Sequence, residues 1–211
     1  MKKYLFIFFG LLLLTSCGSL YLTDSKNISS QKNKYDKILV ISRFANMTAR
    51  VSLEDAVVNK LLESNIKAEA SYKTIKTERL SKELSEEQVE AMVDDLASKG
   101  FTGIIINNFL SKDQYQDVVS GGAYMQYYPV RYGRFGRYIG VYPMTTWAPD
   151  TIESGVEFSL ESCLYDIQVD KEDNLQWVGH FVIKDPSNLS QVSKIYAKEL
   201  VNKLLEDSVE P

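Results

Sequence analysis

The sequence predicts a single α/β domain, with a mixed sheet of about five strands, three helices packed on the sheet, and a long aromatic loop. Two observations support this prediction. Apolar, β-branched runs typical of buried strands alternate along the chain with segments whose apolar residues recur at helical spacing. About 195 residues remain once an N-terminal signal segment is set aside, which is enough for one core of ordinary size. We therefore expect the domain to span residues 35–211.

The first half of the domain predicts a strand, a helix and a second strand. Residues 37–44 have the continuous apolar content of a buried central strand. Ser52, with Asp55 three residues later, indicates the start of a helix that ends near Asn65. Residues 66–75 alternate in part between apolar and polar side chains, which favours a second strand.

A second helix and a third strand follow. Ser85 and Gln88 have the spacing of a capping box, in which each residue's side chain bonds the other's backbone N–H, and Gly100 supplies the end of the helix. Residues 101–106 then predict another buried strand.

The C-terminal part predicts a strand hairpin and a closing helix. Residues 156–169 and 175–183 have strand character, and the polar segment 170–174 between them predicts an antiparallel turn. Residues 188–205 carry a wide apolar stripe at helical spacing, so we expect this helix to pack against the sheet.

The N-terminus has the three parts of a secretory signal. Lys2 and Lys3 precede an apolar stretch of residues 5–14, and small residues precede the cysteine in Leu14-Thr15-Ser16-Cys17. This pattern resembles the lipobox of bacterial lipoproteins. The resemblance implies that residues 1–16 are a cleaved signal peptide and that Cys17 carries a diacylglyceryl group, commonly with a third acyl chain such as palmitate. The alternative is an ordinary secreted protein that is cleaved near Ser16.

Residues 17–34 are mostly polar and predict a flexible, lipidated tether between the membrane and the domain. Removal of the signal leaves 22 basic and 28 acidic residues, a net charge of about −6, which argues against nucleic acid as a partner. Cys163 would then be the remaining thiol, so an intramolecular disulfide is impossible. We expect Cys163 to be a small buried side chain.

The segment that most invites a functional interpretation is the Gly/Tyr/Arg-rich loop at residues 121–149. No acidic residue lies between Asp117 and Asp150. Aromatic rings interleaved with arginines suit stacking, cation–π contact and carboxylate recognition, and they recur at protein interfaces. The same tyrosines could instead fold back over the domain's own sheet. The candidate interaction residues are Tyr124, Tyr127, Tyr128, Arg131, Tyr132, Arg134, Phe135, Arg137, Tyr138, Tyr142 and Trp147.

Catalysis finds little support in the sequence. His180 is the sole histidine, and no Gly-x-Ser-x-Gly or phosphate-binding Gly-Lys-Ser/Thr motif occurs. Clustered His and Cys ligands for a metal are also lacking. We therefore predict a protein that is not an enzyme and has neither cofactor nor metal. A hydrolase that uses paired carboxylates stays open as a weaker possibility.

The order of elements resembles that of small α/β domains in bacterial envelope lipoproteins, including curli-secretion and penicillin-binding-protein-activator proteins. From about Gly121 onward, the aromatic loop and the Trp177-Val178-Gly179 strand also resemble envelope lipoproteins of uncharacterised function. The chain lacks the membrane-inserting hairpin of the curli-secretion type, which argues against a pore.

These resemblances imply a lipoprotein of the outer membrane, because Gly18 follows the cysteine where an inner-membrane lipoprotein of some Gram-negative bacteria has Asp. Residues 19–25 lack the acidic run of surface-export tags, which favours the periplasmic face. The predicted function is a non-catalytic binding or assembly accessory that acts through its aromatic/Arg loop. Its partner would be an envelope protein. The alternative is a glycan or peptidoglycan binder.

Overall fold

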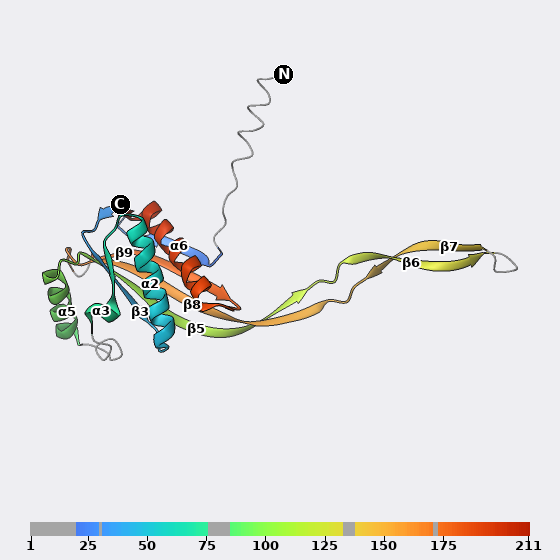
Figure 1. The fold of residues 1–211 in the computed structure, drawn as a ribbon, viewed down its shortest axis with the longest axis horizontal. Helices are drawn as coiled ribbons and strands as arrows, with labels where there is room; N and C mark the ends of the chain where they lie inside the picture. Colours follow the sequence, from blue (N-terminus) through green and yellow to red (C-terminus); the bar gives the residue numbers. More distant parts are fainter. Residues whose placement is uncertain (1–19, 30, 76–84, 133–137, 171–172) are drawn as a thin grey trace, which may run out of the picture. The chain divides into compact units, whose positions relative to one another are not determined.

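The computed structural model describes residues 20–29, 31–75, 85–132, 138–170 and 173–211 (Figure 1). The described chain forms two compact units. The larger unit contains the residues up to Ser111 and the segment Phe158–Pro211, and the smaller unit is the segment Lys112–Glu157.

A six-stranded mixed sheet has the strand order β1-β9-β8-β5-β3-β4. Strand β3 is parallel to both β4 and β5, and β1 is antiparallel to β9. A small parallel sheet joins β2 to β10. The strands are β1 (Leu22–Asn27), β2 (Asn33–Lys34), β3 (Ile38–Arg43), β4 (Ala68–Ala70), β5 (Gly103–Val119), β8 (Thr151–Asp166), β9 (Leu175–Lys184) and β10 (Val209–Glu210).

The described residues form four helices: α2 (Met47–Glu63), α3 (Ser71–Thr74), α5 (Glu86–Ser98) and α6 (Leu189–Asp207). Helices α2 and α6 lie side by side on one face of the sheet (Figure 1), and α5 packs on the other face. The predicted α/β class is therefore confirmed, with six strands in the main sheet where about five were expected. In the part of the chain that the structure describes, no helix combines the length and the apolar character that a membrane span requires.

The core has two parts because β3 is buried on both faces. Ile38 and Val40 belong to the main cluster under α2 and α6, where Trp177 is also buried. Leu39 and Ile41 belong to the second cluster, which includes side chains from α5. A strand covered on both sides has no polar face, which is why its sequence reads as a continuous apolar run.

Helix α2 begins earlier than the sequence indicated. Its N-cap is Asn46, whose side-chain oxygen accepts the backbone N–H of Ala49 at 2.9 Å, so the helix starts at Met47 and not near Ser52. Asn is among the strongest N-cap residues because its short side chain reaches that backbone donor. Ser52 instead makes a tertiary contact, with its Oγ 3.0 Å from the Oγ of Ser193 on α6. Helix α5, in contrast, has the predicted capping box of Ser85 and Gln88.

The second predicted strand is much shorter than expected. Strand β4 covers Ala68–Ala70, and the chain then turns into the short helix α3. The Ser71 hydroxyl donates to the buried carboxylate of Glu54, at 2.8 and 2.9 Å from its two oxygens. This buried hydrogen bond holds the backbone at Ser71, so the strand ends there, whereas the alternating sequence predicted that it continues to residue 75.

Residues 22–27, which we expected within the flexible tether, form the edge strand β1. The Glu199 carboxylate on α6 accepts three successive backbone N–H groups, those of Leu20, Tyr21 and Leu22, at 2.5 to 2.9 Å. Tyr21 and Leu22 also pack against the main core. Backbone pairing with β9 and the carboxylate of Glu199 hold this strand in place. Because both partners lie far away in the sequence, the polar residues of the strand did not indicate a strand by themselves.

Most of the segment expected to be a long loop is also regular structure. Strand β6 (Ala123–Tyr132) and strand β7 (Tyr138–Trp147) pair antiparallel as a separate two-stranded sheet in the smaller unit. Its content of tyrosine, valine and threonine is typical of strands. The Gly and Arg residues that suggested a loop gather near residues 133–137, which lie outside the described residues. We refer to residues 121–149 as the aromatic hairpin.

Candidate functional site

The register of the aromatic hairpin brings together candidate residues that are distant in sequence. Tyr128 is the partner of Tyr142, and Tyr132 is the partner of Tyr138. Directly opposed residues share a face of a ribbon, and so do residues two positions apart along a strand. The ladder therefore places Tyr124 on that same face.

The other face of the ribbon carries the remaining described candidates. Tyr127 is opposite Pro143, Arg131 is opposite Ile139, and Trp147 is opposite Ala123. The sequence predicted these residues as one set, but the register divides them between two faces. Arg134, Phe135 and Arg137 lie outside the described residues, as does Cys17.

The base of the hairpin is closed by backbone groups and one carboxylate. The Gly121 N–H donates to Asp150 Oδ1 at 2.8 Å, and the Ala148 N–H donates to the Gly122 carbonyl at 3.1 Å. A Cβ atom at Gly121 would overlap the Ala148 carbonyl, whereas one at Gly122 would meet nothing within 4 Å. Glycine at position 121 is therefore required for this closure, and the adjacent glycine is not.

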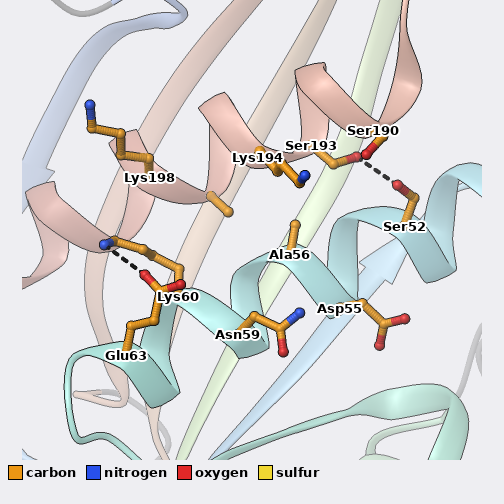
Figure 2. A pocket seen from close by; sticks show the side chains of 11 residues that line it. Ser52, Asp55, Ala56, Asn59, Lys60, Glu63, Ser190, Ser193, Lys194 and Lys198 are labelled. Atoms are coloured by element: carbon orange, nitrogen blue, oxygen red, sulfur yellow. Dashed lines mark hydrogen bonds and ion pairs between the residues drawn. The ribbon is translucent and has the colours of Figure 1, made fainter.

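A polar groove of about 540 Å³ runs between α2 and α6 (Figure 2). Lysines and carboxylates both line it, so it has no single sign of charge. Lys60 Nζ pairs with Glu63 Oε2 at 3.1 Å, and the Ser52–Ser193 contact bridges the two helices. Its lining comprises Ser52, Asp55, Ala56, Asn59, Lys60, Glu63, Ser190, Ser193, Lys194, Ala197 and Lys198.

A second, apolar pocket of about 430 Å³ lies at the end of the same helix pair. Its lining comes from α2, β5, β8, β9 and α6 and from the connections between β3 and α2 and between β9 and α6. None of these residues was predicted from the sequence to be functional. No local signal could have found them, because almost all are ordinary apolar residues that are brought together only by the fold. The lining is Phe44, Ala45, Asn46, Ala49, Leu53, Phe109, Phe158, Leu160, Ile183, Pro186, Leu189, Val192 and Ser193.

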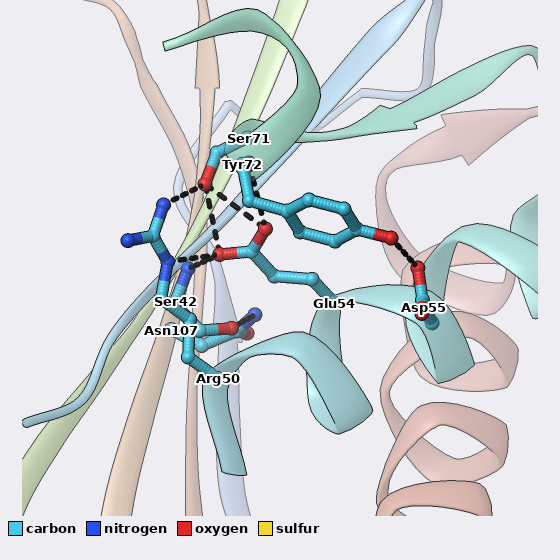
Figure 3. Close-up of polar contacts among 7 residues, drawn as sticks. All are labelled: Ser42, Arg50, Glu54, Asp55, Ser71, Tyr72 and Asn107. Carbon is cyan, nitrogen blue, oxygen red and sulfur yellow. Dashed lines mark hydrogen bonds and ion pairs between the residues drawn. The ribbon is translucent and has the colours of Figure 1, made fainter. Parts of the chain in front are cut away.

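The most buried ionic group is the Glu54 carboxylate on α2, which is fully buried (Figure 3). It accepts Arg50 Nε at 3.0 Å, the Ser42 backbone N–H at 2.8 Å and the Ser71 hydroxyl. The Tyr72 backbone N–H lies 3.4 Å from its other oxygen. These hydrogen bonds satisfy both carboxylate oxygens inside the core. We refer to these residues as the buried carboxylate cluster and assign it a structural role.

A second buried network crosses the sheet beside this cluster. Asn107 on β5 donates from Nδ2 to Ser42 Oγ at 3.2 Å, and its Oδ1 accepts the hydroxyls of Ser162 and Tyr196 at 2.7 and 3.1 Å. Burial raises the pKa of Tyr196, so its hydroxyl stays protonated as a donor. The network ties β3, β5, β8 and α6 together through satisfied hydrogen bonds, which is the arrangement expected of a structural core.

The sole histidine lies on the surface of β9, with its side chain nearly half exposed. His180 Nε2 is 3.4 Å from Glu161 Oε2, and Nδ1 is 4.0 Å from Asp24 Oδ2. Among the described residues, no group of three or more His, Cys, Asp or Glu side chains is placed to hold a metal ion.

The chain matches no protein-family model and no curated protein sequence. Solved structures with a similar arrangement include the PelC dodecamer from Paraburkholderia phytofirmans, which is 12% identical, with a TM-score of 0.42 over 86% of this chain and 94% of that one. Another is lipoprotein GNA1162 from Neisseria meningitidis, which is 13% identical, with a TM-score of 0.40 over 81% of this chain and 99% of that one.

Cys163 on β8 is buried, as the sequence predicted, and it is a free thiol. Burial raises its pKa to about 12, and the nearby Glu161 carboxylate adds to the rise. Because the thiolate is the reactive form, we expect iodoacetamide at about pH 8 to alkylate the folded chain roughly a thousandfold more slowly than the unfolded chain. The mass shift of a Cys17→Ser chain, followed with and without urea, measures both rates. Equal rates would contradict the prediction.

Proposed function

We propose that this chain is a lipid-anchored, non-catalytic binding module of the bacterial envelope. In this proposal Cys17 attaches it to the outer membrane, the domain faces the periplasm, and the aromatic hairpin contacts an envelope protein. The anchor rests on the lipobox-like sequence, and the contact surface rests on the hairpin.

The observation that carries the proposal is the two-stranded sheet of β6 and β7 with its opposed tyrosines. An isolated two-stranded ribbon is marginally stable in water, so packing against a partner would stabilise it. Tyrosine and arginine are enriched where binding energy concentrates at protein interfaces. Arg131, Arg134 and Arg137 add positive charge to a segment that has no acidic residue between Asp117 and Asp150. A partner surface with carboxylates would complement it.

Photocrosslinking in cells tests the contact surface. A photoreactive phenylalanine analogue replaces Tyr128 in one strain and Tyr138 in another, and mass spectrometry identifies what each position captures. We expect both positions to capture the same envelope protein, because the two residues lie on one face of the hairpin. Changing Arg134 and Arg137 to alanine should abolish the capture.

Two glycine variants provide a matched structural control. Gly121→Ala places a Cβ against the Ala148 carbonyl and should disrupt the base of the hairpin, so capture should fall. Gly122→Ala adds the same methyl group where nothing lies within 4 Å, so capture should persist. An absence of capture from both positions would exclude the hairpin as the contact surface, whereas equal capture in the glycine and arginine variants would exclude a role for the hairpin's base and its arginines.

A glycan or peptidoglycan binder is the second candidate, and the tyrosine face of the hairpin favours it. Aromatic faces stack on apolar faces of sugar rings, and arginines pair with muropeptide carboxylates. Sedimentation with purified cell wall separates the two candidates. Retention that is lost in Gly121→Ala but kept in Gly122→Ala would support the wall, whereas no retention would leave the protein partner as the proposal.

A further inference from the structure

The apolar pocket at the end of α2 and α6 has the lining of a site for a hydrocarbon chain. None of its lining residues is charged, and its two polar side chains are already engaged. Asn46 caps α2 through the Ala49 N–H, and Ser193 contacts Ser52. A polar ligand would therefore find few partners, while an apolar one would displace water from hydrophobic walls.

The pocket leaves large apolar side chains in contact with solvent. Phe109 is 45% exposed and Leu189 is 41% exposed, and both line the pocket. Exposed apolar surface that is gathered in one concavity marks a binding site more often than scattered apolar residues do. An occupant that covered these rings and methyl groups would be stabilised by their burial.

The N-terminal end of the described chain leads toward this pocket. Strand β1 runs antiparallel to β9, with Leu22 opposite Phe181, and the Val182 N–H donates to the Tyr21 carbonyl at 2.9 Å. The described backbone at Tyr21 therefore lies beside the end of β9 that leads to Ile183 and Pro186, which line the pocket. The Glu199 carboxylate holds the chain at Leu20 on α6, the helix whose first turns form one wall.

Cys17 is within reach of this end of the domain. Gly18 and Ser19 separate it from Leu20, and the three steps from Cα to Cα span at most about 10 Å when the chain is fully extended. We propose that one acyl chain carried by Cys17 occupies the apolar pocket. This inference rests on the proposed lipid anchor, and it deepens that proposal by giving one of the acyl chains a site on the protein.

The size of the pocket agrees with this occupant. A methylene group is roughly the size of a water molecule, whose share of liquid volume is about 30 Å³, so a pocket of about 430 Å³ has room for about 14 methylenes. That is most of one acyl chain and less than two. While the protein crosses the aqueous periplasm, the pocket would keep one acyl chain out of water. The short link to Leu20 would also hold this end of the domain close to the membrane.

Intramolecular photocrosslinking of the full lipidated protein tests the proposal. Cells receive a palmitic acid analogue that carries a diazirine, and after irradiation the purified protein is digested and analysed by mass spectrometry. The expected product joins the lipidated N-terminal peptide to a peptide from residues 44–53 or 183–193. Ala49→Trp fills the pocket and should abolish this product. Leu189→Glu, which places a carboxylate at its rim on an already exposed position, should do the same.

The matched control is Ala56→Trp, which makes the same substitution on the same helix. Ala56 lies seven residues after Ala49 and lines the polar groove, not the apolar pocket. It should leave the crosslink intact. An acylated protein without the intramolecular product would overturn the inference while the anchor stands, and so would a product that survives both pocket variants. A free phospholipid or a second copy joined to the pocket would also overturn it. If the protein carried no label at all, the lipid anchor itself would be overturned.

Discussion

Glu54→Ala is expected to destabilise the protein by about 3–5 kcal/mol, because it leaves the buried Arg50 guanidinium without its counter-ion. The Ser42 backbone N–H and the Ser71 hydroxyl would lose their acceptor as well. This loss is large, because native domains have a total free energy of unfolding of only about 5–15 kcal/mol. Urea unfolding of the mature chain, followed by the fluorescence of the buried Trp177, measures the effect.

Two variants on the same helix sharpen this test. Glu54→Gln keeps a carbonyl acceptor and nearly the same shape, so it should destabilise less than alanine does. Glu63→Ala removes a carboxylate that is 66% exposed and paired with Lys60, so it should cost less than about 1 kcal/mol. A similar loss for Glu54→Ala and Glu63→Ala would contradict the structural role of the buried carboxylate cluster.

Cys17→Ser is expected to release the protein from the membrane fraction entirely. Each buried methylene contributes about 0.8 kcal/mol to membrane binding, so two or three acyl chains hold a protein far more firmly than a single chain does. A serine at position 17 would carry none of these chains, because the thiol is the group that receives the diacylglyceryl unit in a lipoprotein. Incorporation of labelled palmitate and fractionation of the envelope measure this effect.

Cys163→Ser provides the control, because this thiol is buried on β8. It should keep both the label and the membrane location. A Cys17→Ser chain that remained in the membrane fraction would contradict the lipid anchor and would leave the pocket without its proposed occupant.

The elements that the sequence predicted well are those fixed by local chemistry. The capping box of Ser85 and Gln88 specifies the start of α5 within four residues. The run that contains β3 and the stripe of α6 each contain enough apolar residues to identify the element and its buried face. The concentration of tyrosine and arginine at residues 121–149 is local in the same sense.

The misjudged elements depend on partners that are distant in sequence. Strand β1 exists because β9 and Glu199 supply hydrogen bonds to a polar segment. Strand β4 ends where Ser71 meets Glu54, and the tyrosines of the hairpin share a face because of the ladder between β6 and β7. No window of sequence contains both members of such a pair.

The sequence by itself therefore determined the α/β class, the lipobox-like pattern of the N-terminus and the composition of the aromatic hairpin, since each depends on residue types over short stretches. Only the tertiary structure decided the burial of Glu54, the pairing of the tyrosines and the existence of the apolar pocket. These three features arise from side chains and strands that meet across the fold. Their energies depend on burial and on mutual distance, which folding sets.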